Sequence, residues 1–594
     1  MRSIMTDLAE DPSMELESYW GVGPKTRATL EGAIGTETAI EAIESGDVRA
    51  LVDAGVDRSR ATRVLRHAHS ADGMKLLATR DTRLVYKEIL DVAAEHAVSE
   101  AAADRIRTLT PLSDRSEMER RLDAVERGRE GWTGMNETTR SEVLSAFESY
   151  DTAGGDRLAA VEAAVELAET GVSGPVFEPI AELDTGRLAA AAAALRALGD
   201  DRIEPGADDE LDRLRTARET VDRLSANPDS VLEELRAGGV NDTAGFRAEL
   251  LDYLSAETSV DPELIRAAMA GEAVDAIGFV TETLRSLRSE LDGAIDERTA
   301  TVRTELESDI EEAGEDVDRA RAAVATVARD LSLGRFAAAY DLERPTYVDR
   351  ETIAVVNARN LSLSRGGDVQ PVTYAVGEHT IAPPGDERVT VLTGANSGGK
   401  TTLLETLCAI VILAHMGLPV PAAEAEISVL DRLVFHRRHA SFNAGVLEST
   451  LQSVVPPLVS GERTLMLVDE FEAITEPGRA ADLLGGLVRL TLAEGALGTF
   501  VTHLADDLEP LPETARTDGI FAKGLTDELE LEVDYQPHFG AVGRSTPEFI
   551  VSRLVANADD RAEEAGFRTL AEAVDTEIVQ RTLSDAEWSG LERD

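Results

Sequence analysis

The chain has 594 residues, a net charge of -53 and 43% apolar residues. A chain of this length exceeds what a single hydrophobic core organises, so we expect several domains. The apolar content excludes a disordered protein, and the acidic charge is spread along the whole sequence rather than gathered in a tail. Nearly all basic residues are arginine, because lysine occurs only at positions 25, 75, 87, 400 and 523. We interpret this as a salt-adapted, halophilic surface on which hydrated carboxylates maintain solubility.

Cysteine content and apolar runs restrict the compartment. The single cysteine, Cys408, excludes internal disulfides and cysteine-ligated zinc clusters. The longest uninterrupted apolar run, 407–414, is too short to span a bilayer, and the N-terminus lacks a basic region followed by an apolar one. We therefore expect a soluble cytoplasmic protein that has no membrane partner.

The first 70 residues are expected to form short helices separated by glycine turns. Gly21-Val22-Gly23-Pro24 leads into one helix, and Gly55-Val56-Asp57 leads into a second over 58–67. The pattern resembles a tandem helix-hairpin-helix module, whose turn presents backbone N–H groups to a DNA phosphate without reading sequence. A helical protein-interaction module with solvated arginines remains the alternative. The DNA-contacting residues predicted from this resemblance are Gly21, Gly23, Lys25, Arg27, Arg60 and Arg63.

Two helical regions follow. Residues 71–283 predict a helical core domain, with alanine-rich runs and glycine or proline turns. In 284–340 the apolar residues between Leu306 and Leu331 alternate spacings of four and three, which is a heptad seam. This segment predicts a lever or coiled-coil arm that braces the fold and transmits force, or alternatively clamps a ligand.

The period changes to that of strands from about residue 351, at 352–356, 372–376 and 389–392. A glycine-rich stretch follows, and after it an apolar helix is expected over 402–416. The pattern G-x-x-x-x-G-K-[ST] in this context is a phosphate-binding loop, because its backbone N–H groups, lysine and hydroxyl hold phosphates and Mg²⁺. The predicted ATP-binding residues are Gly394, Ala395, Asn396, Ser397, Gly398, Gly399, Lys400, Thr401 and Thr402.

Two later strands are expected to deliver the chemistry. The apolar run 464–468 ends in Asp469 and Glu470, and 498–501 ends in Thr502-His503. We predict that Asp469 and the hydroxyl of Thr401 hold Mg²⁺ and that Glu470 orients and polarises the water that attacks the γ-phosphate. His503 is predicted to hydrogen-bond that water or the γ-phosphate.

These elements in this order resemble the ATPase domain of the MutS mismatch-repair family, and most closely its short archaeal branch, the second MutS subfamily of DNA-binding ATPases. The resemblance rests on the 396–400 core, on 357–361 and on 543–548. It implies an ABC-type ATPase whose sites form between two subunits of a homodimer. Ala440-Ser441-Phe442-Asn443 resembles the signature loop, so Ser441 and Asn443 are expected to contact the γ-phosphate in trans. Residues 472–478 replace the glycine-rich segment that crosses the family's dimer interface.

Two features of the family are absent from the sequence. The chain has no N-terminal mismatch-reading domain with a Phe-x-Glu wedge, and its acidic end does not resemble the nuclease domain of bacterial members. We therefore expect DNA binding through phosphates, without sequence or mismatch specificity, in repair or recombination. The alternatives are a nucleotide-switched structural clamp and a factor that processes ribosomes or branched DNA.

The predicted architecture is a multidomain chain with α-helical N-terminal and central domains, a coiled-coil lever and an ABC-type α/β P-loop ATPase domain. The predicted boundaries are 1–70 for the tandem helix-hairpin-helix, 71–283 for the helical core domain, 284–340 for the lever, 341–560 for the ATPase domain and 561–594 for a helical acidic tail.

Overall fold

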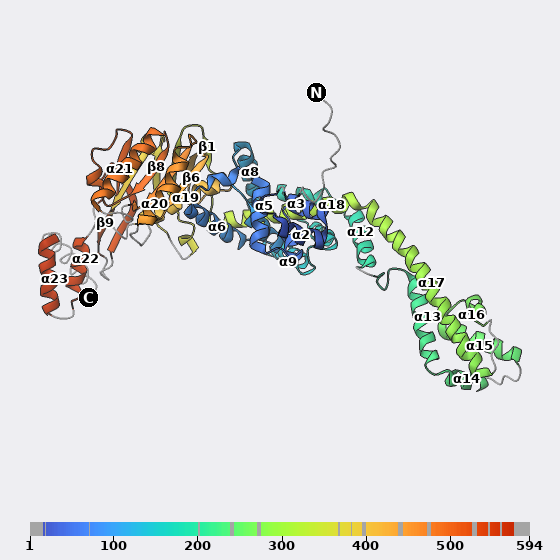
Figure 1. The fold of residues 1–594 in the computed structure, drawn as a ribbon. Helices are drawn as coiled ribbons and strands as arrows, with labels where there is room; N and C mark the ends of the chain where they lie inside the picture. The colour runs from blue at the N-terminus through green and yellow to red at the C-terminus, as the bar shows by residue number, and fades with distance from the viewer. Residues whose placement is uncertain are drawn as a thin grey trace, which may run out of the picture. The chain divides into compact units, whose positions relative to one another are not determined.

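The computed structural model describes residues 16–17, 19–70, 72–199, 202–237, 243–269, 275–365, 369–381, 383–394, 399–437, 444–471, 477–525, 531–543, 547–558 and 561–574. The chain divides into two compact units (Figure 1). The first comprises Met1–Arg140, Ser173–Phe177 and Ala325–Asp594, and the second comprises Ser141–Val172 and Glu178–Val324. Within the described ranges, no helix combines the length and apolar character needed to cross a bilayer.

The larger sheet of the first unit has six strands in the order β10-β9-β4-β8-β7-β6. All its neighbouring pairs are parallel except β9 and β10, which pair antiparallel. Parallel neighbours place their carboxyl ends at one edge, which is where open α/β sheets bind ligands. The strands are β4 (Val389–Gly394), β6 (Arg432–His436), β7 (Thr464–Asp469), β8 (Leu497–Val501), β9 (Ala515–Leu525) and β10 (Leu531–Phe539).

Both faces of this sheet are covered, because alternate strand residues belong to different hydrophobic clusters. Leu392, Leu465 and Leu467 pack in one cluster with α19 (Lys400–His415), whereas Val391, Met466 and Val468 pack in another with α20 (Ala444–Leu458) and α21 (Pro477–Ala493). Helix α19 is apolar around its whole circumference and is correspondingly buried. The expected strands at 352–356, 372–376, 389–392, 464–468 and 498–501 and the expected helix at 402–416 are confirmed.

A second, four-stranded sheet has the order β1-β5-β2-β3. Its strands are β1 (Thr346–Val348), β2 (Thr352–Ala358), β3 (Val372–Gly377) and β5 (Glu424–Ser428). The chain ends, as far as it is described, in α22 (Pro547–Ala556) and α23 (Arg561–Val574), which pack on one another through Val551, Val555 and Ala571.

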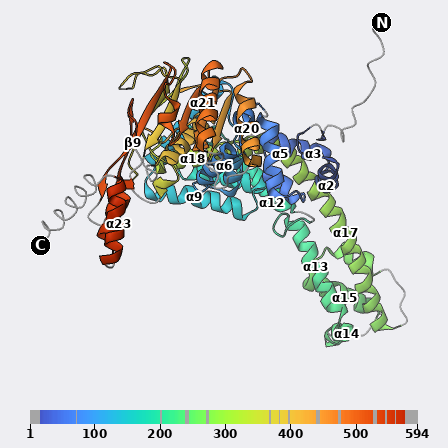
Figure 2. The same cartoon turned by 60° about the vertical axis from the view of Figure 1, so that its left-hand side comes forward.

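Helices before residue 140 are built into the same unit as the sheet. The N-terminal cluster consists of α2 (Pro24–Ile34), α3 (Thr36–Ser45), α4 (Val48–Asp53) and α5 (Arg58–Ser70) (Figure 2). The helices after it are α6 (Arg80–Ala94), α7 (Glu100–Thr108) and α8 (Arg115–Gly134). The Thr79 hydroxyl donates to Phe435 O over 2.6 Å and the Thr82 hydroxyl donates to Leu433 O over 3.3 Å. The segment that begins α6 therefore covers the otherwise open edge of β6.

Helix α8 crosses α18 (Gly314–Ala339) at two glycines of the first unit. A Cβ at Gly128 would lie 2.0 Å from Asp330 O, and one at Gly334 would lie 2.2 Å from the carbonyl carbon of Gly128. Only glycine permits this backbone approach. Among the described residues, short 3-10 helices occur at Gly73–Leu76, Pro175–Phe177, Leu363–Arg365 and Ala505–Leu508.

The regular secondary structure described in the second unit is all helical. Its long α17 (Ala276–Glu312) runs antiparallel to α13 (Asp209–Ser225), because Arg298 pairs with Asp208 at 2.6 Å and Arg218 pairs with Asp292 at 3.0 Å (Figure 1). The remaining helices are α10 (Arg157–Glu169), α11 (Glu178–Ala181), α12 (Thr185–Leu198), α14 (Pro228–Ala237), α15 (Thr243–Thr258) and α16 (Pro262–Ala268), while α9 (Glu137–Thr152) begins in the first unit.

The segment expected to be one lever is two helices. Helix α17 is capped at Ala313, and α18 begins at Gly314. The heptad positions after this break, from Val317 to Leu331, are buried, whereas Leu306 and Ile310 before it are partly exposed. The coiled-coil role of the segment remains a prediction.

Candidate nucleotide site and nucleic-acid surface

The phosphate loop connects β4 to α19. Gly394 ends the strand at φ 129° and Gly399 caps the helix at φ 70°, both in the region that favours glycine. Lys400 is 4% exposed, and its Nζ donates to Gly394 O over 2.8 Å. The Lys400 side chain therefore points back towards the end of β4. The predicted ligands Ala395, Asn396, Ser397 and Gly398 lie outside the described residues.

The first two residues of α19 contact the carboxyl ends of two strands, Lys400 that of β4 and Thr401 that of β7. Strand β8 separates β4 from β7, so the carboxyl end of β7 lies two strands from the phosphate loop. The Thr401 hydroxyl donates to Asp469 Oδ2 over 2.7 Å, and Asp469 is 1% exposed. The predicted pair is thus brought together, while Thr402, one residue further along α19, is half-buried.

The donor set at Thr401 and Asp469 fits Mg²⁺ held together with a nucleotide. Mg²⁺ prefers oxygen ligands and uses one or two protein groups plus phosphates and water. The described residues hold no cluster of three or more His, Cys, Asp or Glu side chains that would form a cage made by protein alone. One hydroxyl and one buried carboxylate are what the phosphate-assisted mode requires.

Glu470 follows immediately and has a left-handed backbone conformation, with φ 43°. This conformation is uncommon for a residue with a Cβ and is retained where the surroundings fix it. Its N–H donates to Val501 O over 3.0 Å, which anchors the turn to β8. Its carboxylate Oε1 lies 3.0 Å from Nε2 of His503, whose side chain is 32% exposed. The predicted base and the predicted histidine therefore meet at the sheet edge.

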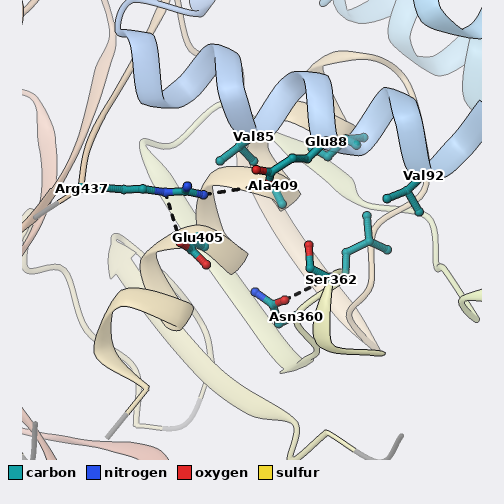
Figure 3. A pocket seen from close by; sticks show the side chains of 10 residues that line it. Val85, Glu88, Val92, Asn360, Ser362, Glu405, Ala409 and Arg437 are labelled. Atoms are coloured by element: carbon teal, nitrogen blue, oxygen red, sulfur yellow. Dashed lines mark hydrogen bonds and ion pairs between the residues drawn. The ribbon is translucent and has the colours of Figure 1, made fainter. Parts of the chain in front are cut away.

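Arg437 contacts carboxylates on both α19 and α6 (Figure 3). Arg437 follows β6, and its Nε lies 3.1 Å from Glu405 Oε1, one helical turn beyond Thr401. Its backbone N–H donates to Asp81 Oδ2 on α6 over 2.9 Å. Burial raises the pKa of Glu405, and the Arg437 charge opposes this rise. Arg437 thus fixes the start of the segment that leads into residues 438–443.

Sequence reasoning missed Tyr535, which stands over the phosphate loop from β10. A Cβ at Gly399 would lie 2.9 Å from Cδ1 of the Tyr535 ring, so the ring packs on the glycine backbone. Tyr535 is nevertheless 42% exposed. No sequence signal identifies this tyrosine, because it reaches Gly399 only through the strand order β10-β9-β4.

The residues expected to act in trans, Ser441 and Asn443, lie outside the described residues. So do residues 472–476, which make up most of the segment that departs from the family pattern. The structure therefore gives no geometry for the predicted trans contacts, and both assignments stay predictions.

Residues of α2, α5 and the turn at Gly55 line an open hollow of about 370 Å³. Helix α2 begins at this hollow with Gly23 as its cap and no side-chain acceptor, so its first N–H groups are not capped by a side chain. At α5, by contrast, Asp57 Oδ1 accepts from Ser59 N at 3.1 Å and Arg60 N at 3.2 Å. The N-terminus of α2 can therefore offer N–H groups to an anion, whereas Asp57 already accepts from those at the start of α5.

The predicted basic residues fall into two groups. Lys25, Arg60 and Arg63 line the hollow and are exposed, and in the described part of the chain no ion pair joins them to a carboxylate. Arg27 instead pairs with Glu17 at 3.3 Å. Arg58 pairs with Asp104 at 2.7 Å and Arg66 donates to Arg107 O at 2.6 Å, so these two arginines dock α5 onto α7. Gly21, at φ 86°, packs on the Val64 side chain.

Comparisons with known proteins bear on the same region. A family model described as MutS domain V matches residues 390–470. The DNA-binding protein MutS2 of Pyrococcus furiosus is 47% identical over 217 residues, which cover 36% of this chain and 38% of that protein. The DNA mismatch repair protein MutS of Chloroflexus aurantiacus is 28% identical over 496 residues, covering 76% of this chain and 47% of that protein.

A third relative is the Endonuclease MutS2 of Shouchella clausii, 27% identical over 260 residues that cover 43% of this chain and 32% of that protein. Each match spans less than half the length of the relative concerned. The matched domain contains the phosphate loop and Asp469, at the sheet edge where Glu470 and His503 meet. The region that carries Thr401, Asp469 and Glu470 is therefore similar to MutS domain V, and the chain is similar to proteins named MutS2.

Proposed function

We propose that the protein is a magnesium-dependent ATPase that binds DNA and works as a homodimer. The observation that carries this proposal is the convergence of Lys400, Thr401, Asp469, Glu470 and His503 at the carboxyl edge of β4, β7 and β8. This set combines a phosphate-binding lysine, a hydroxyl and carboxylate pair, and a second carboxylate beside a histidine. Those are the groups that phosphoryl transfer to water requires.

In the proposed reaction, the Lys400 ammonium leaves Gly394 O and donates to the phosphate oxygens. A hydrogen bond from an ammonium to a charged phosphate is stronger than one to a neutral carbonyl. Glu470 accepts a hydrogen bond from the attacking water, and the left-handed turn at Glu470 keeps the carboxylate at the strand end. His503 fixes the Glu470 carboxylate through the 3.0 Å contact. The water oxygen bonds to the γ-phosphorus, a proton of the water passes to the Glu470 carboxylate, and the bond to the leaving ADP oxygen breaks. Bound Mg²⁺ supplies positive charge for the phosphate oxygens.

We assign Tyr535 as the platform on which the adenine ring rests. Its exposed ring lies directly above the helix cap that would hold the phosphates, and an aromatic contact contributes about 0.5–1.5 kcal/mol. Tyr535→Ala is expected to weaken ATP binding about 3- to 10-fold, whereas Tyr535→Phe keeps the ring and the affinity. Calorimetric titration of the full chain with a non-hydrolysable ATP analogue measures both. Unchanged affinity in Tyr535→Ala would place the base elsewhere.

The homodimer belongs to the proposal because the cis groups form only half of an ABC-type site. Ser441 and Asn443 of one copy are proposed to complete the site of the other. Two nucleotides held between subunits would then close the helical segments around DNA, and hydrolysis would release them.

The hollow at the N-terminal hairpins is the proposed DNA contact. Three exposed cations and an uncapped helix end on one surface suit a phosphate rather than a base edge. The protein as a whole is strongly acidic, so this local basic surface is the exception in its charge distribution. The names of the Pyrococcus and Chloroflexus relatives, a DNA-binding protein and a DNA mismatch repair protein, support DNA as the partner.

The test is the ATPase rate of the full chain, with and without duplex DNA, across KCl concentrations. We expect DNA to stimulate turnover. We also expect the slope of log DNA affinity against log salt concentration to become smaller by about 0.9 in Arg60→Ala or Arg63→Ala for each phosphate contact that is lost. Arg49→Ala is the control, because Arg49 belongs to the same module but pairs with Asp53 at 3.8 Å. Equal slopes in all variants, or preference for ribosomal RNA or a four-way junction, would favour the alternatives.

A further inference from the structure

An exposed tryptophan of the N-terminal cluster, Trp20, is not among the residues that line the hollow. Trp20 is 57% exposed, and its ring centroid lies 3.7 Å from that of His67, with the ring planes 31° apart. The pair presents the outer face of an indole to solvent and rests its inner face on an imidazole.

His67 supports the indole as a neutral ring. Burial, and secondarily the charge of Arg83, lower the pKa of His67, so its imidazole is uncharged at neutral pH. The His67 ring therefore supports one face of the indole, so less further ordering is needed when another ring stacks on the opposite face.

The stack and the cations lie along one face of α5. Arg60, Arg63 and His67 are spaced three and four residues apart, so they lie in one row, with His67 about 6 Å further along the helix than Arg63. The row therefore begins with two cations that line the hollow and ends under the exposed indole. Positive charge for a backbone and an aromatic face for a base, on one continuous surface, is the combination that binds single-stranded nucleic acid.

We propose that Trp20 is a stacking platform for an unpaired base, so that the hairpin module binds DNA where a single strand adjoins a phosphate held by Lys25, Arg60 and Arg63. The inference rests on the proposed DNA-binding function and specifies its substrate as single-stranded or strand-end DNA rather than continuous duplex. A base inside an intact duplex already stacks on its neighbours and offers no free face to the indole.

The chemistry also fits the acidic, salt-adapted surface. Binding through phosphate contacts weakens by about 0.9 log units per contact for each tenfold rise in salt. Stacking is not a charge interaction and is not screened in the same way. Trp20 would then supply the part of the affinity that persists when salt has weakened the contacts of Arg60 and Arg63.

The test uses the full-length chain with Trp132→Phe and Trp588→Phe, which leaves Trp20 as the only tryptophan of the three in the sequence. Its fluorescence is titrated with oligo(dT), with a duplex that carries a single-stranded tail, and with the same duplex blunt-ended. We expect quenching by the first two DNAs and little by the third. In the otherwise native chain, Trp20→Ala is expected to weaken binding to the tailed duplex about 5- to 100-fold and to the blunt duplex less than about twofold.

Trp20→Phe should recover most of the affinity for the tailed duplex, and Trp20→Ala should leave the salt slope unchanged while Arg60→Ala lowers it. An equal loss of affinity for the tailed and the blunt duplex in Trp20→Ala would show that the tryptophan is structural and would overturn the inference. Tighter binding of oligo(rU) than of oligo(dT), measured by the same quenching, would also overturn it. If blunt duplex binds normally and Trp20→Ala changes nothing, only this inference fails. If none of the DNAs binds, the proposed DNA-binding function fails with it.

Discussion

Glu470→Gln is expected to lower kcat for ATP hydrolysis about 10²- to 10⁴-fold while changing ATP affinity by less than about twofold. The amide has the size of the carboxylate and its oxygen still accepts a hydrogen bond from His503, so the 3.0 Å contact survives. It cannot accept a proton from, or strongly polarise, the attacking water. Single-turnover rates with saturating ATP separate this loss of chemistry from any change in binding.

Two further variants sharpen the assignment. Glu494→Gln removes the same charge from an exposed position after α21 and should leave the rate unchanged. His503→Asn should lower kcat by a smaller factor, and the double variant with Glu470→Gln should be no slower than Glu470→Gln alone, because the two side chains act as one hydrogen-bonded unit. A normal rate in Glu470→Gln would show that another group activates the water, and additive losses would mean that His503 acts separately.

The parts of the site that follow strands were predictable from sequence. Short continuous apolar runs locate β4, β7 and β8, and parallel strands place their carboxyl ends together. Thr401 and Asp469 were therefore expected to meet, and they do so at 2.7 Å. The 3.0 Å contact between Glu470 and His503 follows from the same topology, although whether these residues catalyse hydrolysis remains a proposal.

Contacts made across long sequence separations were not predictable. Tyr535 reaches Gly399 because β10 pairs antiparallel with β9, and the sequence does not show on which side of β4 that hairpin joins the sheet. The boundary at Arg140 between the two compact units could not be predicted either. Residues before and after Arg140 have the same helical period, but only the earlier ones carry Thr79 and Thr82, whose hydroxyls bond the edge of β6.

The role of each basic residue was the least predictable property. The sequence does not distinguish a basic side chain that holds two helices together from one that is exposed to a ligand. Six arginine or lysine positions follow the two glycine turns, yet Arg58 and Arg66 bond to α7 and Arg27 pairs with Glu17. Lys25, Arg60 and Arg63 remain exposed at the hollow. The likeness of the two turns also conceals the cap formed by Asp57, whose carboxylate takes the N–H groups that a phosphate would need.

Lys400→Ala is expected to weaken ATP binding about 10- to 100-fold, since a charged hydrogen bond to phosphate contributes about 1.5–3 kcal/mol. Lys400→Arg should not restore it, because the 4% exposed side chain occupies space fitted to a compact ammonium that bonds Gly394 O. Lys523→Ala is the matched control: it removes the same charge from an exposed position on β9.

Nucleotide-linked stability provides a readout of the Lys400 change that does not depend on turnover. At an ATP concentration about 100 times the native Kd, binding stabilises the native protein by about 2.7 kcal/mol. With affinity reduced 10- to 100-fold at the same concentration, the stabilisation falls to about 0.4–1.4 kcal/mol, so the rise in melting temperature on adding ATP shrinks accordingly. Without nucleotide, Lys400→Ala should melt at or above the native temperature, because a desolvated ammonium has been removed. A full ATP-dependent rise in Lys400→Ala would contradict the phosphate-binding role, since the loop would then hold nucleotide through its backbone alone.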